Sequence, residues 1–337
     1  MSHLALGDYI YQGVFLKQLA NTYPHLRIDI WFDDCRDHHK TWHSGRNQIL
    51  SQWLESEPNV GTVYANPSSP QQRQAQLEQA KSANYDIVFF IATQRSERFC
   101  QFARDIAGAN LACGAHGVRG LKRIFHKGKI NALNASLAIT PSNQFDHISD
   151  FYQHHFSALI EIPAPSSPFQ HLSVPQHYLD DAKASANSDN LVFINHLSTT
   201  QKRDWQFSQV LECIRAMHVK DPQLQFVINA PSEQLALLEE QIQRADLQDI
   251  TIVTFSAQQH FYQLPAMMSQ ARLVISVETA IMHLAASLGV PAVALIREKA
   301  RQWRPLGPGE VLVGGKRVDS INAQDVADKA LALLANA

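Results

Sequence analysis

The chain has 337 residues, of which 45% are hydrophobic and 18% charged, and its formal net charge is −2. This length exceeds the size at which single hydrophobic cores stop growing, so two domains are expected. The charge excludes a bulk attraction to nucleic acid, and the lack of a Gly-x-Gly-x-x-Gly fingerprint weighs against a nicotinamide or flavin enzyme.

The N-terminal segment MSHLALGDYIYQG lacks the basic run and uninterrupted apolar stretch of a secretory signal. The four cysteines are far apart in the sequence and form no Cys-x-x-Cys pair, at positions Cys35, Cys100, Cys113 and Cys213. This spacing predicts reduced thiols rather than a disulfide framework or a zinc site. Both features predict a cytoplasmic protein.

The first half of the chain alternates helix-like and strand-like segments. The continuous apolar run at 85–91 is typical of a strand buried on both faces. Other strands are expected at 27–32 and 60–64, and helices at 10–23, 44–55 and 70–83. Such alternation predicts a parallel sheet that is covered by helices.

A segment rich in proline and serine, residues 162–176, interrupts this pattern and is expected to connect two domains. The alternation then restarts, with strands expected at 191–195, 225–229, 250–253, 273–277 and 292–296, and helices at 207–218, 233–245 and 261–269. We therefore expect domains over 1–168 and 169–320, followed by a C-terminal helix within 321–337 that packs on a domain surface. Two α/β domains that face one another form a cleft, which is the expected ligand site.

The stretch 271–305 is the most informative part of the chain. It reads as a buried strand, a polar break at Glu278-Thr279, a helix that carries His283, a Gly-Val-Pro stop and a second strand. Its apolar pieces are too short to span a bilayer. A carboxylate and a hydroxyl where a parallel strand leads into a helix lie at the carboxyl edge of the sheet, where helix N-termini collect anions. This arrangement predicts a nucleotide site.

Several motifs along the chain occur in a recognisable order: Gly7-Asp8 before a helix, Tyr23-Pro24 before a strand, Tyr85-Asp86-Ile87-Val88 with Gln94-Arg95-Ser96 downstream, Lys202-Arg203-Asp204-Trp205, and residues 277–291. Together they resemble glycosyltransferase family 9, the bacterial ADP-heptose:lipopolysaccharide heptosyltransferases. The last segment is similar to the family's most diagnostic motif, Asp-Thr-Gly followed by His-Leu-Ala-Ala and Gly-x-Pro.

The resemblance implies the GT-B fold, with two Rossmann-like α/β/α domains facing a central cleft. The N-terminal domain would bind the acceptor and the C-terminal domain the nucleotide sugar. The implied reaction is the inverting, metal-independent transfer of heptose from ADP-heptose to the lipopolysaccharide core of a Gram-negative bacterium. The enzyme would work at the cytoplasmic face of the inner membrane, in peripheral association with it, and would need no cofactor besides its nucleotide-sugar substrate.

The chain departs from the family pattern around the expected donor site. Glu278 replaces the usual Asp, Ala280 the usual Gly, and residues 296–299 a Gly-Pro-Thr/Ser loop. Two alternatives therefore stay open. One is the same fold with another nucleotide sugar or another surface-glycan acceptor, and the other is a non-catalytic nucleotide-sugar-binding protein.

Inverting transfer needs a base for the acceptor hydroxyl and groups that stabilise charge on the leaving diphosphate. The resemblance implies Asp8, in the loop between the first strand and the first helix, as the base. The alternative role for Asp8 is an ordinary helix N-cap.

The expected donor-binding residues are each weighed against a plain structural role. The phosphates would meet either Lys202 or Arg203, a choice that the sequence leaves open, with the N-terminus of the helix at Thr279 and Ala280. Glu278 would accept a ribose hydroxyl, or else cap the helix. His283 would reach the diphosphate or sugar, or else be a packed histidine. Arg297 and Lys299 would clamp phosphate, or else belong to a solvated charge run.

A basic run in the first half is the expected acceptor site. It contains Arg119, Lys122, Arg123 and Lys127, and Arg95 precedes it. These cations would recognise the anionic Kdo and phosphate groups of a lipopolysaccharide core, or hold the enzyme at an anionic membrane. Nucleic acid is the less favoured partner, because no nucleic-acid-binding motif accompanies the run.

One acidic and histidine-rich segment invites a metal hypothesis, through Asp34, Asp37, His38, His39 and His43. No pair in it has the spacing of a known site, and histidines four residues apart occur by chance in a chain that has 16. No metal is therefore predicted.

Overall fold

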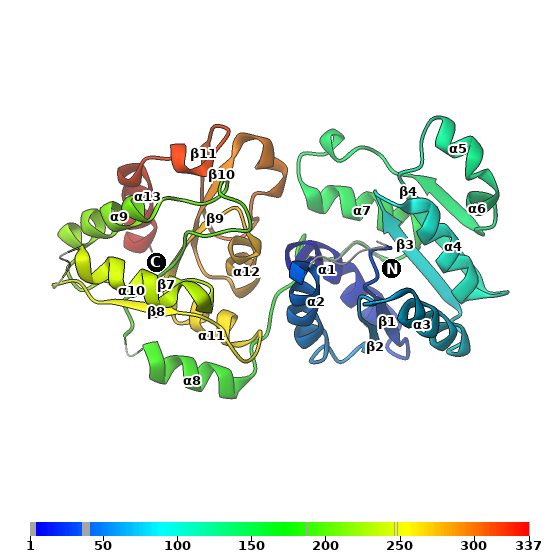
Figure 1. Cartoon of the computed structure of the whole chain (residues 1–337), viewed down its shortest axis with the longest axis horizontal. Helices are drawn as coiled ribbons and strands as arrows, with labels where there is room; N and C mark the ends of the chain where they lie inside the picture. The colour runs from blue at the N-terminus through cyan, green and yellow to red at the C-terminus, as the bar shows by residue number, and fades with distance from the viewer. Residues whose placement is uncertain (1–4, 36–40, 187, 246, 248, 337) are drawn as a thin grey trace. The chain divides into compact units, whose positions relative to one another are not determined.

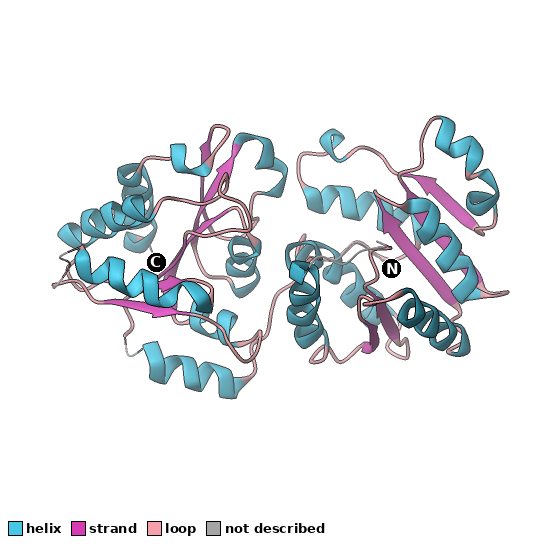
Figure 2. Ribbon diagram, viewed as in Figure 1, coloured by secondary structure: helices cyan, strands magenta, loops and turns pink. Residues whose placement is uncertain are grey.

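The structure, a computed structural model, describes residues 5–35, 41–186, 188–245, 247 and 249–336, with the backbone alone for 41–47. The chain forms two compact units, residues 1–168 and 169–337 (Figure 1). In each unit parallel strands are flanked by helices (Figure 2). The predicted α/β class is therefore confirmed.

The N-terminal unit contains two parallel sheets among its described residues. One pairs β1 with β2, and the other has the order β3-β4-β5. The strands are β1 (Ile28–Trp31), β2 (Val60–Tyr64), β3 (Ile87–Ala92), β4 (Leu111–His116) and β5 (Ala135–Ala138). The helices are α1 (Leu6–Thr22), α2 (Thr41–Leu54), α3 (Pro70–Ser82), α4 (Ser96–Ala107), α5 (Leu121–Phe125), α6 (Lys127–Asn131) and α7 (Ile148–Leu159).

The C-terminal unit is built on one six-stranded parallel sheet with the order β11-β10-β9-β6-β7-β8. The strands are β6 (Leu191–Asn195), β7 (Gln225–Asn229), β8 (Ile252–Phe255), β9 (Ala271–Val277), β10 (Ala292–Arg297) and β11 (Gly309–Gly314). The helices are α8 (Gln176–Ala186), α9 (Phe207–Lys220), α10 (Leu235–Arg244), α11 (Gln263–Ser269), α12 (Ala280–Leu288) and α13 (Ala323–Ala335), with the 3₁₀ helix η3 at Glu298–Trp303.

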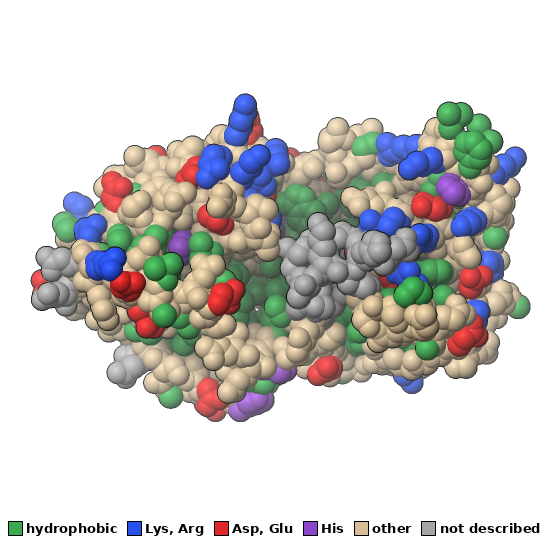
Figure 3. Space-filling view, in the orientation of Figure 1, with side chains coloured by type: hydrophobic (Ala, Val, Ile, Leu, Met, Phe, Trp, Pro, Cys, Tyr) green, Lys and Arg blue, Asp and Glu red, His purple; other side chains and the backbone are tan. Residues whose placement is uncertain are grey.

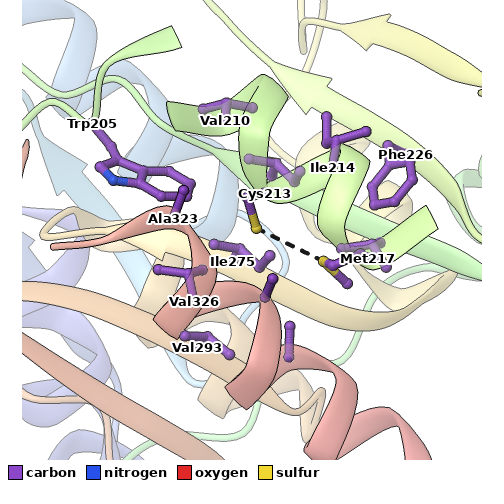
Figure 4. Packing of buried hydrophobic residues seen from close by; sticks show 14 of the residues in the cluster. Trp205, Val210, Cys213, Ile214, Met217, Phe226, Ile275, Val293, Ala323 and Val326 are labelled. Carbon is purple, nitrogen blue, oxygen red and sulfur yellow. Dashed lines mark hydrogen bonds between the residues drawn. The ribbon is translucent and has the colours of Figure 1, made fainter. Parts of the chain in front are cut away.

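The core of the C-terminal unit lies between this sheet and the helices α9 and α13. Every residue of β6 and β10 is buried, as expected for central strands covered on both faces. Figure 4 shows side chains of α9, among them Ile214 and Met217, packed near Val293 of β10 and Val326 of α13. The C-terminal helix thus contributes to the core of this unit.

Some elements carry no clear signal in the sequence. In β4, Gly114 pairs with Phe90 of β3, and a Cβ at Gly114 would lie 2.2 Å from the Phe90 ring. The strand therefore needs a glycine, which weakens its apolar pattern. The prediction also missed the strands β5 and β11 and the five helices from α4 to α8. Strand β5 is mostly exposed, so its short sequence lacks the signature of a buried strand.

Candidate functional site

The strand order of the C-terminal unit reverses between β6 and β9. The chain runs from β6 outward to β8 on one side, and from β9 outward to β11 on the other. Side chains at the carboxyl ends of these two neighbours form a polar network: Asn195 Nδ2 lies 3.3 Å from Ser276 Oγ and 3.2 Å from Thr279 Oγ1. Ligands of parallel α/β sheets bind outside the carboxyl ends of the strands at such a reversal.

Helix α12 begins at this edge. Thr279 is its N-cap, and its Oγ1 accepts the backbone N–H of Ile281 at 3.3 Å, while Ala280 is the first helical residue. The Thr279 hydroxyl therefore already serves the helix and the Asn195 network. The backbone N–H groups of the first turn place the positive end of the helix dipole at the same edge.

A pocket of about 630 Å³ opens beside this helix start. Its lining comes from the loop after β6, from the end of β10 and the start of η3, and from the segment after β11: Thr200, Gln201, Lys202, Arg203, Arg297, Lys299 and Arg317. The structure thus brings together four of the predicted donor-binding residues. Lysine and arginine side chains gather on this part of the C-terminal unit, near β10 and β11 (Figure 3).

The charges in the pocket are only partly balanced. Arg297 is paired with Glu278, and Arg317 with Asp319 at 2.7 Å. The Arg203 guanidinium meets uncharged groups, namely the hydroxyls of Thr199 and Thr200 and the Glu278 carbonyl oxygen.

The ammonium groups of Lys202 and Lys299 make no hydrogen bond or ion pair with any described residue. Together with Arg203 they leave an excess of positive charge in a pocket at a helix N-terminus. That combination suits a phosphate or diphosphate.

Glu278 and Arg297 bind each other. Arg297 Nη2 lies 2.5 Å from Glu278 Oε1, Arg297 Nε lies 2.8 Å from Oε2, and the backbone N–H of Arg297 also points to Oε2 at 3.3 Å. The hydrogen bonds to Glu278 raise the pKa of Arg297. A ribose hydroxyl on Glu278, or a phosphate on Arg297, would have to share its partner with this ion pair.

His283 is buried within α12, and its ring forms a T-shaped pair with Trp303 of η3, with 6.4 Å between the ring centroids. This arrangement matches the alternative role that the sequence left open for His283, that of a packed histidine. Its burial favours that role over direct contact with a diphosphate.

Asp8 lies in helix α1, not in a loop before it. Helix α1 begins at Leu6 with Ala5 as N-cap, so Asp8 is neither a loop residue nor the N-cap, and both structural expectations were wrong. Its Oδ2 accepts the backbone N–H of Ala5 at 3.1 Å, and its Oδ1 accepts the Tyr152 hydroxyl at 2.8 Å. The first of these bonds, made from the third helical position, explains why the helix starts earlier than its apolar pattern indicates.

Tyr152 comes from α7 and is buried. Burial and the neighbouring Asp8 carboxylate raise its pKa well above the usual value. Tyr152 therefore stays protonated and remains a hydrogen-bond donor to Asp8 across the whole working range of pH.

The predicted acceptor-binding residues belong to the N-terminal unit, at the starts of α4 and α5 and on α5 and α6. Arg95 is the N-cap of α4 in the left-handed region, with φ 51°, and its Nε donates to the Asp34 carbonyl at 2.6 Å. Arg119 donates to the Ile139 carbonyl at 2.5 Å. The other three cations are exposed, with Lys122 and Arg123 on α5 and Lys127 on α6.

The metal hypothesis rests on residues that are mostly not described. Asp37, His38 and His39 lie outside the described residues, as does the side chain of His43. Asp34 forms an ion pair with Arg95 at 3.8 Å. Within the described part of the chain, no group of three or more histidine, cysteine, aspartate or glutamate side chains is placed to bind a metal. No described helix is long and apolar enough to cross a membrane.

The sequence reasoning missed three residues that lie beside predicted site residues within their own unit: Tyr152 in the N-terminal unit, and Asn195 and Arg317 in the C-terminal unit. Asn195 carried a usable signal, because a polar residue that ends a wholly apolar strand marks the carboxyl edge. Arg317 and Tyr152 carried none, because each reaches its place through a part of the fold that was not predicted.

Comparisons with known proteins agree with this architecture. A sequence model of glycosyltransferase family 9 (heptosyltransferase) matches residues 110–329. A family 9 glycosyltransferase from Veillonella parvula is 18% identical, with a TM-score of 0.76, and the match covers 99% of this chain and 95% of that one. No curated protein sequence matches the chain.

Two structures from E. coli are similar in fold. ADP-heptose lipopolysaccharide heptosyltransferase II is 15% identical, with a TM-score of 0.72, and the match covers 98% of this chain and 96% of that one. Heptosyltransferase WaaC with ADP is 17% identical, with a TM-score of 0.69, and the match covers 98% of each chain. At these identities the likeness concerns the fold.

Proposed function

Because the chain belongs to glycosyltransferase family 9, we propose that it transfers heptose from ADP-heptose to the lipopolysaccharide core, with inversion at the sugar carbon. The pocket at the carboxyl edge of the C-terminal sheet is the observation that carries this proposal. The chain shares its fold with heptosyltransferase WaaC of E. coli, whose structure was solved with ADP.

In this proposal the donor diphosphate occupies the basic pocket. Lys202, Arg203 and Lys299 face the phosphate oxygens, and the N-terminus of α12 adds its dipole. As the bond from the sugar to the diphosphate breaks, negative charge grows on the leaving group. Cations that already stand in the pocket stabilise this charge and lower the barrier. They supply the stabilisation that a metal ion gives in other transferases, so the transfer is proposed to be metal-independent.

Asp8 is the proposed base. Its carboxylate takes the proton of the acceptor hydroxyl while that oxygen attacks the sugar carbon. The hydrogen bond from Tyr152 fixes the orientation of the carboxylate and favours its charged form. The closing of the two units over the donor, which would bring this base to the sugar, stays a prediction.

The acceptor is proposed to approach the N-terminal unit. Exposed cations on α5 and α6 suit its Kdo and phosphate groups, and Arg95 and Arg119 order the neighbouring loops. Because such an acceptor is anchored in lipid, the enzyme would work at the cytoplasmic face of the inner membrane of a Gram-negative bacterium.

Ligand-induced stabilisation tests the donor part of the proposal. A ligand that binds only the folded state raises stability in proportion to ln(1 + [L]/Kd), so ADP, UDP, GDP and CMP can be ranked by thermal shift. We expect ADP to give the largest shift. Transfer to a core acceptor that lacks heptose, followed by mass spectrometry, then tests the sugar. No stabilisation by any of the nucleotides would contradict the proposal and favour a protein that does not bind nucleotide sugars.

A second candidate is the same reaction class with another nucleotide sugar. The Glu278–Arg297 ion pair favours it, because both residues stand where the family pattern differs and each already has a partner. A larger thermal shift with UDP or GDP than with ADP would support this second candidate over the first.

A further inference from the structure

Helix α5 of the N-terminal unit exposes an unusual set of side chains. Of its five residues, Leu121 is 74% exposed, Ile124 is 71% exposed and Phe125 is 81% exposed. Single exposed apolar residues are normal on a protein surface, but three large ones in little more than one helical turn form a patch that marks an interaction site.

The same helix is basic. Lys122 and Arg123 are its other two residues, and Lys127 follows at the start of α6. All three are exposed. Figure 3 shows hydrophobic side chains at the position of α5, with lysine and arginine side chains nearby. A binding partner therefore has to offer an apolar phase and negative charge together.

Helix α5 is attached to the N-terminal unit on both sides. Gly120 precedes the helix with φ 56°, and Ile130 of the next helix is buried in the core together with Leu133. Arg119 is tied to the Ile139 carbonyl on the other side. The apolar side chains thus stand on a supported turn whose two ends are fixed to the unit.

We infer that α5 inserts Leu121, Ile124 and Phe125 into the interfacial region of a bilayer with anionic headgroups, while Lys122, Arg123 and Lys127 contact the headgroup phosphates. An amphipathic segment with bulky apolar residues and interleaved cations has the composition of a membrane-surface helix. Each cation near an anionic surface adds to the attraction, which salt weakens. The helix is too short to cross the bilayer, so the contact is peripheral.

This inference deepens the proposed function by naming the surface that meets the membrane around a lipid-linked acceptor. Its test needs neither donor nor acceptor. A failure of vesicle binding would leave the nucleotide and transfer experiments untouched, and a failure of those experiments would leave vesicle binding to stand.

The experiment measures co-sedimentation of the full chain with vesicles of phosphatidylcholine alone, and with an equimolar mixture of phosphatidylcholine and phosphatidylglycerol. We expect binding to the mixed vesicles that weakens as salt is added. The variant Leu121→Ser/Ile124→Ser/Phe125→Ser should bind at least about tenfold more weakly, because it buries much less apolar surface. Its thermal unfolding should match that of the parent, since the three side chains are exposed.

A matched control removes exposed apolar side chains elsewhere. Val219 on α9 is 76% exposed and Leu237 on α10 is 58% exposed. The variant Val219→Ser/Leu237→Ser should bind vesicles like the parent. A blue shift of the emission of Phe125→Trp on adding mixed vesicles, relative to the parent, would place that side chain in the apolar phase and support the inference.

Two outcomes would overturn the inference. The first is a serine variant that binds the mixed vesicles as tightly as the parent. The second is a parent that binds neither vesicle, and binding that then appears only after lipopolysaccharide is added would assign the surface to acceptor recognition instead.

Discussion

Arg297 and Glu278 form a bidentate ion pair that joins the carboxyl ends of the neighbouring strands β10 and β9. Arg297 Nη2 lies 2.5 Å from Glu278 Oε1, and Arg297 Nε lies 2.8 Å from Oε2. Both residues stand where the chain departs from the family pattern. A glutamate is one methylene longer than the usual aspartate, and an arginine replaces part of a Gly-Pro-Thr/Ser loop. The two departures therefore meet in one ion pair.

A double-mutant cycle tests this coupling. The pair is shielded from water, with 10% and 12% of the two side chains exposed, so removing one partner leaves a charge without compensation. Glu278→Ala and Arg297→Ala should each lower the free energy of unfolding by about 2 to 3 kcal/mol. The double variant should lose clearly less than the sum, as measured by urea unfolding of the full chain.

The exposed pair Arg244 and Glu240 on α10 is the matched control. The same cycle there should give a coupling of about 0.3 to 0.5 kcal/mol, as for other surface pairs one helical turn apart. Additive losses at Glu278 and Arg297 would mean that the ion pair contributes nothing beyond its two residues.

The two lysines of the pocket should matter for binding more than for stability. Lys202 and Lys299 have no charged partner among the described residues, so their removal breaks no internal contact. Lys202→Ala and Lys299→Ala should each weaken ADP binding by about tenfold and reduce its salt dependence, with unchanged thermal unfolding. Isothermal titration measures the affinity, and Lys220→Ala on α9 is the control. ADP affinity that survives both changes would remove the pocket from the proposed donor site.

Arg203 should behave differently from Lys202. Its guanidinium ties the loop after β6 together through Thr199, Thr200 and the Glu278 carbonyl oxygen. Arg203→Ala should therefore lower the melting temperature as well as the ADP affinity. This contrast would also settle which of the two basic residues acts mainly through the phosphate.

The parts of the fold that the sequence predicts are those with a strong local signal. Strands β6 and β7 were predicted with their observed bounds, because a central strand buried on both faces has to be apolar along its length. Strand β4 needs Gly114 to make room for Phe90, so its local signal is weak. The information that defines β4 lies in the neighbouring strand.

The same division applies to the site. Topology alone predicts that residues after β6, β9 and β10 share one edge, so Lys202, Thr279 and Lys299 were within reach of the sequence. The partner of Glu278 was not, because Arg297 is 19 positions away and is selected by side-chain reach. Tyr152 is 144 positions from Asp8, and only the packing of α7 against α1 brings the two together.

Asp8→Asn should separate chemistry from structure at the proposed base. An asparagine oxygen can still accept the Ala5 N–H, so the start of α1 should persist. Because an amide cannot take up the acceptor proton, turnover should fall by roughly two to four powers of ten, while ADP affinity stays nearly unchanged. Unchanged turnover in a correctly folded variant would assign Asp8 to helix capping alone.

Tyr152→Phe is the companion test. It removes the hydroxyl that donates to Asp8 and leaves the ring in place. A carboxylate that loses a donor is protonated more easily, so the acid limb of the kcat/KM profile should move to higher pH. A purely structural role for Tyr152 would lower activity without moving that limb.

Buried histidines should make the folded chain less stable in mild acid. Burial lowers the pKa of His116, His155 and His196. His155 shows why. Its Nε2 accepts the backbone N–H of Thr140 at 3.1 Å, and its Nδ1 lies 2.7 Å from the Phe151 carbonyl oxygen, so the neutral ring satisfies both contacts. A second proton would put two donors face to face at Nε2.

The sign of the effect follows from proton uptake. An unfolded histidine titrates near pH 6.5, whereas these folded histidines take up a proton only at lower pH. Between the two values the unfolded chain binds more protons, so stability rises with pH. The contribution of these buried neutral histidines to the free energy of unfolding is fully present above about pH 6.5. It is lost as the pH falls toward the pKa values of the folded chain. Urea unfolding at pH 7.5 and 5.5 should therefore give a lower free energy at the acid value, by about 1 kcal/mol or more.

His155→Gln isolates one of these contributions. The variant should be less stable at pH 7.5, because it loses a buried ring. The slope of its unfolding free energy against pH should be smaller than that of the parent, by the equivalent of up to one proton taken up on unfolding. The exposed His25 on the same unit serves as the control, since His25→Gln should keep the slope of the parent. Equal slopes for the parent and His155→Gln would mean that His155 takes up its proton at the same pH in the folded and the unfolded chain. That result would contradict the hydrogen bond from the Thr140 N–H to Nε2, which needs a neutral ring.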